Sequence, residues 1–283
     1  MDATELRSLA IQAAAGAGVP HDLGAALRYL QQAAEHGSRP AQAELAALVG
    51  NWRLVRDIGA GKPLREGMPE RLRAAVDLRA WQRLPRGEAF SEAPRIVVVR
   101  GFVSDEICDW LIRLGKPHLY AAEVFDAASG DSSAYIGRTN RTAELLLARS
   151  DVVLGFVRSR IAAMTGVPVQ GFEPSQVLHY EAGQEFRAHH DFLDVRVPAL
   201  AREVAERGQR ALTVLVYLNE NYDDGHTAFP HLGRSFKGRK GDALVFWNVG
   251  DDGAPDWRTL HAGTAPTRGE KWLFSQWIRI RTA

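Results

Sequence analysis

The stretch Phe186-Arg187-Ala188-His189-His190-Asp191-Phe192 contains a His-x-Asp pair, and the expected fold is organised around it. His261 follows Asp191 by seventy residues, and Lys271 comes ten residues after that histidine. These side chains are the candidates for a metal site and for a cationic anchor beside it. On its own, a His-x-Asp pair is a weak signal because a lone histidine is usually structural.

Strand geometry predicts different orientations for the two neighbouring histidines of this stretch. Alternate residues of an extended strand point to the same side, so His189 and Asp191 are expected to project together and His190 to face away. Two histidines and one carboxylate can occupy one face of an octahedral metal and leave three positions open, an arrangement that suits non-haem Fe(II). Zinc accepts the same ligand types, so the residues alone leave the metal open.

Short runs with a period of two begin near Gln176 and continue to the end of the chain. Turns rich in Asn, Asp and Gly, such as 221–225, separate them, and this pattern is typical of a β-sandwich or jelly roll. The interruption at 198–208 predicts a short surface helix. The runs cover residues 176–181, 211–219, 243–248, 259–262 and 271–280.

Residues 1–85 carry Ala, Leu and charged residues at helical spacing, with Asp22 as a candidate N-cap. The segment resembles one unit of a Sel1-type, tetratricopeptide-like repeat. The matching residues are Gly16, Gly18, Val19, Asp22, Ala25, Ala26, Tyr29, Leu30, Ala33, Ala34, Gly37 and Ala41. Such arrays need about three units for independent stability, so we expect these helices to pack on a neighbouring domain. A partner-binding platform and a plain helical hairpin are the alternatives for their role.

Domain organisation follows from the prolines at 85 and 94, which predict a helical region over 1–85 and a second domain over 86–283. The net charge is +1, from 35 Lys and Arg against 34 Asp and Glu, so no broad positive field is expected to attract nucleic acid or a membrane. The one cysteine, Cys108, cannot form an internal disulfide. With no signal-like N-terminus and no run of membrane-span length, the expected location is cytoplasmic.

Spaced residues over nearly two hundred positions resemble the prolyl 4-hydroxylase branch of the Fe(II)/2-oxoglutarate-dependent dioxygenases. The matching segments are Gly101-Phe102-Val103-Ser104-Asp105-Glu106, Tyr180-x-x-Gly183-Gln184-x-Phe186-x-x-His189-x-Asp191, Arg210-x-x-Thr213-x-x-x-Tyr217-Leu218-Asn219, Gly225-x-Thr227-x-Phe229-Pro230, Lys240-Gly241-Asp242-Ala243-Leu244-x-Phe246, and His261-Ala262-Gly263 through Gly269-x-Lys271-Trp272 to Trp277. The resemblance implies an α+β fold: a double-stranded β-helix (jelly-roll) catalytic domain with supporting helices, preceded by a small α-helical region. His226 departs from the family, which has glutamate there, and its effect is left open.

The resemblance also implies residue roles. His189, Asp191 and His261 would bind the iron, and Lys271 would pair with the distal carboxylate of 2-oxoglutarate. A buried ammonium needs an anionic partner, which a dicarboxylate supplies.

Five further side chains are expected around the cosubstrate or substrate. Tyr217 is the second candidate for the distal carboxylate, with Thr213 behind it, and Tyr180 is a candidate donor to the cosubstrate. Trp277 would wall the same cavity, although aromatic core packing is the alternative for all three rings. Arg138 lies in a segment that partly matches a family segment near the substrate groove.

The implied activity is a hydroxylase that uses Fe(II), 2-oxoglutarate and O2, with ascorbate as an optional reductant, on a peptidyl proline of a protein substrate. The alternatives are a free amino acid, another peptidyl residue or a small metabolite. A groove facing residues 117–140 would indicate a polypeptide, and a closed pocket a small molecule. A nucleic-acid demethylase is disfavoured because that branch anchors 2-oxoglutarate with arginine. A helical-repeat scaffold with an inactive barrel is the non-enzyme alternative, and the oligomeric state is open.

Overall fold

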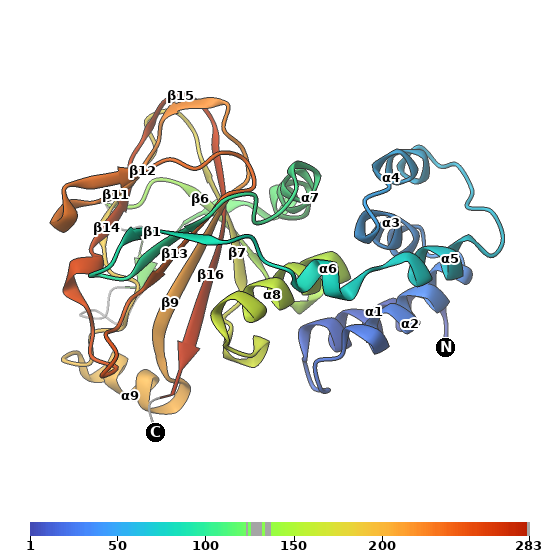
Figure 1. Cartoon of the computed structure of the whole chain (residues 1–283), viewed down its shortest axis with the longest axis horizontal. Helices are drawn as coiled ribbons and strands as arrows, with labels where there is room; N and C mark the ends of the chain where they lie inside the picture. Colours follow the sequence, from blue (N-terminus) through green and yellow to red (C-terminus); the bar gives the residue numbers. More distant parts are fainter. Residues whose placement is uncertain (123, 126–131, 134–136, 282–283) are drawn as a thin grey trace. The chain divides into compact units, whose positions relative to one another are not determined.

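A computed structural model describes residues 1–122, 124–125, 132–133 and 137–281, which are grouped in two compact units (Figure 1). The first unit takes in 1–84 and 146–170, and the second takes in 85–145 and 171–283. Residues 123, 126–131 and 134–136, within the segment 117–140, lie outside the described residues. The division into domains over 1–85 and 86–283 stays a prediction.

The described residues of the first unit form helices and no strands. Apart from α5, its α-helices are capped at their N-termini by short polar side chains, and Asp22 is one of these caps, because its carboxylate accepts from the Ala25 N–H. The sequence pattern does not reveal α4 to α6, which are too short, at five to eight residues, to show a clear period. The helices are α1 (Ala3–Ala15), α2 (Leu23–Glu35), α3 (Arg39–Leu48), α4 (Trp52–Gly59), α5 (Met68–Ala75), α6 (Leu78–Gln82), η2 (Leu147–Arg149) and α8 (Val152–Thr165).

Helix α8 is packed against the N-terminal helices α1, α2, α3 and α6. Glu44 of α3 is buried, and its two carboxylate oxygens accept from Arg7 Nε at 2.7 Å and from the Val152 N–H at 2.8 Å. The second of these bonds satisfies one of the free N–H groups at the start of α8. The α8 segment therefore shares its packing with residues 1–84 although it lies far from them in the sequence.

The second unit contains an eight-stranded antiparallel sheet in the order β1-β2-β13-β9-β16-β7-β6-β3 among its described residues. Strand β16 has the bounds that its period-two pattern predicts, 271–280. The strands are β1 (Gly87–Ser91), β2 (Ile96–Val99), β13 (Ala243–Trp247), β9 (Gln209–Tyr217), β16 (Lys271–Ile280), β7 (Ser175–Tyr180), β6 (Arg141–Leu145) and β3 (Tyr120–Ala121).

A smaller, four-stranded sheet packs against the large one (Figure 1). Phe229 and Phe236 from it join side chains of the large sheet such as Leu215, Phe246 and Leu273 in one buried core, which confirms the jelly-roll fold. The small sheet consists of β12 (Arg234–Phe236), β11 (Thr227–Phe229), β14 (His261–Gly263) and β8 (Phe186–His189), and two further strand pairs are β10 (Tyr222–Asp224) with β15 (Pro266–Gly269) and β4 (Val124–Phe125) with β5 (Ser132–Ser133).

Two longer helices support the sheets of the second unit. Helix α7 (Asp105–Gly115) is capped by Ser104 and packs on β7 and β6, where Gly115 lies against Val177 with no room for a Cβ. Helix α9 (Pro198–Arg207) is the short surface helix that interrupts the strand pattern. The 3-10 turns are η1 (Lys116–His118), η3 (Val169–Gly171), η4 (Pro230–Leu232) and η5 (Trp257–Thr259). None of the helices described is both long and apolar enough to cross a membrane.

Candidate active site

The three candidate ligands lie together on the small sheet. His189 ends β8, Asp191 follows it just beyond the strand, and His261 opens β14 directly opposite His189 in the antiparallel pairing. One ligand atom from each of the three lies within 4.8 Å of the others. Asp191 Oδ1 is 3.6 Å from His189 Nε2, and Asp191 Oδ2 is 3.5 Å from His261 Nε2.

Backbone carbonyl groups set the tautomer of both histidines. His189 Nδ1 donates to the Arg187 carbonyl at 2.8 Å, and His261 Nδ1 donates to the Thr259 carbonyl at 3.0 Å. A carbonyl oxygen can only accept, so each ring carries a proton on Nδ1 and turns its Nε2 towards the site. This is the usual support for metal-ligating histidine.

The electrostatics favour the protonation states that metal ligands need. Burial lowers the pKa of His261 to about 4, with the nearby His189 adding to the effect, so its imidazole is neutral. Burial alone would raise the pKa of Asp191, but His261, His189 and the Thr213 hydroxyl outweigh it, and the pKa of this carboxyl lies below its ordinary value. A neutral imidazole beside an ionised carboxylate fits a divalent cation.

His190 belongs to a different group of side chains. Its Nε2 donates to the Trp257 carbonyl at 3.0 Å, and its ring packs on those of Phe192 and Trp257. The observed orientation agrees with the strand alternation, although β8 ends at His189.

A cavity opens from the three candidate ligands into the space between the sheets. Three of the other predicted residues, Arg138, Tyr180 and Trp277, line it, whereas Lys271, Tyr217 and Thr213 lie in its buried surroundings. The lining is completed by Gln176, Leu178, Phe186, Leu215, Thr227, Gly263, Leu273 and Ser275.

Lys271 is a buried cation with an unsatisfied ammonium group. It is fully buried, and its Nζ has no hydrogen-bond partner among the described residues. The Nζ lies 5.0 Å from the ring centroid of Tyr180 and 6.0 Å from that of Tyr217. Burial lowers the pKa of Lys271 to about 7, and the charge of Lys237 lowers it further. An orphaned ammonium on the strand face shared with Leu273 and Ser275 of the cavity is what an anionic cosubstrate would satisfy.

The hydroxyl groups of Tyr217 and Thr213 already have protein partners. Tyr217 Oη is 2.8 Å from Thr227 Oγ1 and 3.1 Å from the Phe236 carbonyl, and Thr213 Oγ1 donates to Asp191 Oδ2 at 2.6 Å. Tyr180 has a pKa raised to about 12 by burial, so it is a neutral donor. The cosubstrate contacts of these three residues stay predictions.

Arg138 and Trp277 stand at the cavity wall. The Arg138 guanidinium lies 4.5 Å from the ring centroid of Phe186, which in turn stacks on the His189 ring with centroids 3.6 Å apart. The ring of Trp277 lies 3.8 Å from the guanidinium of Arg210.

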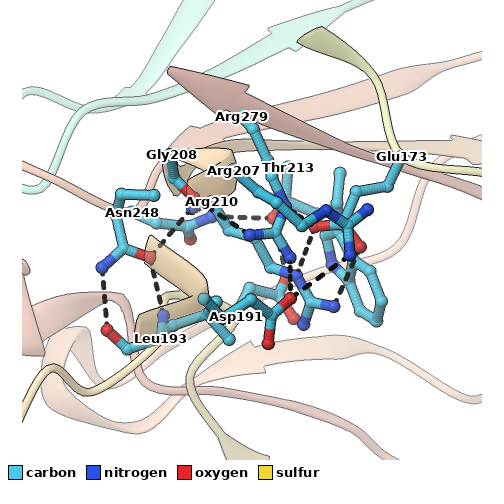
Figure 2. Close-up of polar contacts among 12 residues, drawn as sticks. Glu173, Asp191, Leu193, Arg207, Gly208, Arg210, Thr213, Asn248 and Arg279 are labelled. Atoms are coloured by element: carbon cyan, nitrogen blue, oxygen red, sulfur yellow. Dashed lines mark hydrogen bonds and ion pairs between the residues drawn. The ribbon is translucent and has the colours of Figure 1, made fainter. Parts of the chain in front are cut away.

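A buried ionic network holds Arg210 beside that ring. Glu173 accepts from Arg210 Nε at 2.7 Å and Nη2 at 2.9 Å, and from Arg279 Nε at 2.6 Å (Figure 2). The network therefore fixes Arg210 against the ring of Trp277, which lines the cavity. The substrate and cosubstrate roles of Arg138 and Trp277 stay predictions.

Two polar residues near the site were missed from the sequence. Gln176 lies two and four residues before Leu178 and Tyr180 on β7, so the period of the strand could have placed it on the same face. Asn248 is fully buried and donates from Nδ2 to Thr213 Oγ1 at 2.9 Å. No local pattern announces Asn248, because its contact depends on the pairing of β13 with β9. The side chain of His226 is not part of the cavity lining.

Together, a jelly roll, a buried His-Asp-His cluster and an adjoining cavity with an unpaired lysine define a metal-dependent enzyme. Residues 175–279 match the model of the 2OG-Fe(II) oxygenase superfamily. The chain is 34% identical over 212 residues to probable prolyl 4-hydroxylase 3 of Arabidopsis thaliana, covering 68% of this chain and 72% of that protein. It is also 34% identical over 206 residues to prolyl 4-hydroxylase 1 of the same plant, covering 68% and 71%.

The similarity to these plant proteins shows that the chain belongs to the prolyl 4-hydroxylase family of Fe(II)/2-oxoglutarate-dependent dioxygenases. It is an enzyme that uses Fe(II), 2-oxoglutarate and O2. Among solved structures, the viral collagen prolyl hydroxylase of Paramecium Bursaria Chlorella virus-1 in complex with 2-oxoglutarate is 26% identical, with 65% of this chain and 95% of that chain covered and a TM-score of 0.49.

Proposed function

We propose that this dioxygenase hydroxylates prolyl residues of a polypeptide at C4, with His189, Asp191 and His261 as the iron ligands and Lys271 as the anchor of 2-oxoglutarate. The target is supported by the plant relatives, whose names specify prolyl 4-hydroxylation. The observation that carries the site is the fully buried Lys271 ammonium, which has no partner among the described residues.

The bound Fe(II) and 2-oxoglutarate supply the oxidation: O2 is split, one oxygen atom enters a substrate C–H bond, and the cosubstrate becomes succinate and CO2. The chain's own residues hold and orient the reactants. Lys271 pairs with the distal carboxylate, and Tyr180 offers a neutral hydroxyl within the cavity. Arg138 and Trp277 line the cavity, where Arg138 would contact the substrate and Trp277 would wall the cosubstrate site.

Turnover with defined substrates tests this function. We expect succinate, and a product heavier by one oxygen atom, when the enzyme is incubated with Fe(II), 2-oxoglutarate and proline-containing peptides. The same assay with free proline or with peptides lacking proline separates the peptidyl target from a small metabolite or another residue. Full turnover by both His189→Ala and Asp191→Ala would show that the iron site lies elsewhere.

The helical region needs a separate substrate experiment. Trapping with the full chain, Fe(II) and a non-reacting 2-oxoglutarate analogue, followed by mass spectrometry of captured proteins, identifies hydroxylated targets. A partner-binding role for residues 1–85 predicts that substitutions on their exposed faces change capture without changing turnover of short peptides.

A further inference from the structure

Asp191 is held by a hydrogen-bond chain that ends in a residue with no expected part in the reaction. Asn248 Nδ2 donates to Thr213 Oγ1 at 2.9 Å, and Thr213 Oγ1 lies 2.6 Å from Asp191 Oδ2. Asn248 and Thr213 are both fully buried, so water does not compete for these bonds. Thr213, Asp191 and Asn248 are all among the residues drawn in Figure 2.

The hydrogen bonds that lead from Asn248 through Thr213 to Asp191 have a fixed direction. A hydroxyl has one proton and two acceptor lone pairs. Because the Asn248 amide group donates to Thr213, the hydroxyl proton of Thr213 is free to go to the carboxylate. The distance of 2.6 Å is typical of a charge-assisted hydrogen bond to an ionised carboxylate. The other end of the Asn248 amide, the buried Oδ1, has no hydrogen-bond partner in the described part of the chain.

The main chain holds Asn248 and Asp191 in place as well. The Asn248 N–H donates to the Ala211 carbonyl at 2.8 Å, and its own carbonyl accepts from the Asp256 N–H at 2.9 Å. Just after Asp191, the backbone N–H and carbonyl of Leu193 are both bound by the Gln209 side chain, at 2.7 and 2.8 Å. Gln209 and Thr213 both belong to β9, so one strand fixes both the loop and the carboxylate.

We propose that Thr213 and Asn248 are positioning residues that make Asp191 a ligand through one oxygen only. Both oxygens lie near a ligand histidine, Oδ1 at 3.6 Å from His189 Nε2 and Oδ2 at 3.5 Å from His261 Nε2, but the hydrogen bond from Thr213 makes Oδ2 the weaker donor to the metal. A carboxylate that bound through both oxygens would take one of the three positions needed by 2-oxoglutarate and O2. The proposal rests on the iron site of the proposed function and gives Thr213 a role other than the cosubstrate contact expected from the sequence.

Metal binding to the full-length protein tests the proposal without turnover. Co(II), which is stable in air and has visible absorption, is titrated into the metal-free chain and into five variants, and the metal-free melting temperature of each is recorded. Thr213→Val keeps the shape but removes the hydroxyl, and we expect an affinity roughly 10- to 100-fold lower, as for other residues that support metal ligands. Thr213→Ser keeps the hydroxyl, and the affinity should return towards that of the unmodified chain.

Thr142→Val is the matched control. Thr142 is also a buried threonine of the large sheet, but its hydroxyl has no hydrogen-bond partner among the described residues. We expect its removal to leave Co(II) affinity unchanged. Equal affinity of the Thr213→Val and Thr142→Val variants would overturn the proposal. Absence of Co(II) binding by the unmodified chain would overturn the iron site itself, and the proposal with it, so the two failures are distinguished.

Asn248→Asp tests the direction of the hydrogen bonds between Asn248, Thr213 and Asp191. Aspartate has nearly the same shape as asparagine but can only accept when ionised, so it would draw the Thr213 proton away from Asp191. We therefore expect a larger loss of Co(II) affinity than for Asn248→Ala, which removes the donor without adding a competing acceptor. Similar affinities of the two variants would show that Asn248 does not direct the hydroxyl.

Discussion

Lys271 and Tyr180 face each other across the antiparallel pairing of β16 with β7, and the ammonium of Lys271 lies 5.0 Å from the ring centroid of Tyr180. Lys271 Nζ has no hydrogen-bond partner in the described part of the chain. The electron-rich ring of Tyr180 lies beside this positive charge. A cation in this position is costly to the folded protein until an anion arrives. The effect of this charge on the stability of the protein and its effect on cosubstrate binding can therefore be measured separately.

Replacement of Lys271 by methionine should have opposite effects on stability and on cosubstrate binding. Methionine keeps the length of the side chain but removes the buried charge, so the metal-free and cosubstrate-free variant should be more stable than the unmodified chain. It should also lose most of its affinity for 2-oxoglutarate. Thermal melting with increasing 2-oxoglutarate in the presence of Co(II) measures both effects, because a bound ligand raises the melting temperature. An unchanged ligand-induced shift in the variant would exclude Lys271 as the anchor.

The lowered pKa of Lys271 predicts a pH dependence of stability. Its ordinary pKa is 10.5, and burial, followed by the charge of Lys237, lowers it to about 7 in the folded chain. Between these two values the unfolded chain binds more protons, so the contribution of Lys271 to the free energy of unfolding rises as pH increases from about 7 to 10.5. Urea unfolding over this range should show a slope that the methionine variant lacks. Because a carboxylate partner favours the ammonium form, 2-oxoglutarate binding above pH 7 should take up a proton, which calorimetry in buffers of different ionisation enthalpy detects.

The residues around Lys271 show which contacts a linear pattern can predict. The period of two placed Lys271, Ser275 and Trp277 on one face, and strand β16 has the predicted bounds. The partners of Thr213 were not predictable in this way, because they follow from where β9 lies between β13 and β16 and from the loop beyond β8. A sequence motif indicates which residue types recur. The orientation of the Thr213 hydroxyl depends instead on contacts between three segments that are separate in the sequence.

Helix α8 shows the same limit at a larger scale. The helix ends at Gly166 in a left-handed cap. Its position in the sequence favoured the catalytic domain, but its packing partners include α1 and α3. Apolar periodicity reports that a face is buried and does not report which element covers it.

Glu173 is the next residue whose removal should be informative. Its carboxylate joins Arg210 and Arg279 in a buried network behind Trp277. Glu173→Gln keeps the shape but places an amide N–H against a guanidinium N–H. Arg279 keeps its ion pair with Glu203, whereas the part-buried Arg210 loses its carboxylate partner. We expect a loss of about 3–5 kcal/mol in the free energy of unfolding, the range for breaking a buried ion pair.

An exposed ion pair provides the control for Glu173. Asp223 pairs with Arg268 at 2.7 Å, and both side chains are more than half exposed. Asp223→Asn should cost only about 0–1 kcal/mol, because water screens the pair. Urea unfolding measures both variants, and equal costs would mean that the Glu173 network adds no more than a surface pair.

The contact between α8 and α1 can be tested at Gly155. A Cβ on Gly155 would lie 2.6 Å from the Ala14 Cβ and 3.2 Å from the Ala14 carbonyl oxygen, so the two helices could not keep their spacing. Alanine is the better helix former, and propensity alone would give Gly155→Ala a gain of about 1 kcal/mol. We expect the clash to outweigh this gain and to lower the free energy of unfolding by about 1–3 kcal/mol, as overpacking commonly does. Gly59→Ala is the matched control, because Gly59 is also helical and has nothing within 4 Å of the added methyl group. If chemical denaturation shows both variants to be as stable as the unmodified chain or more so, α1 is free to move away from α8, and the N-terminal helices are not packed tightly on that segment.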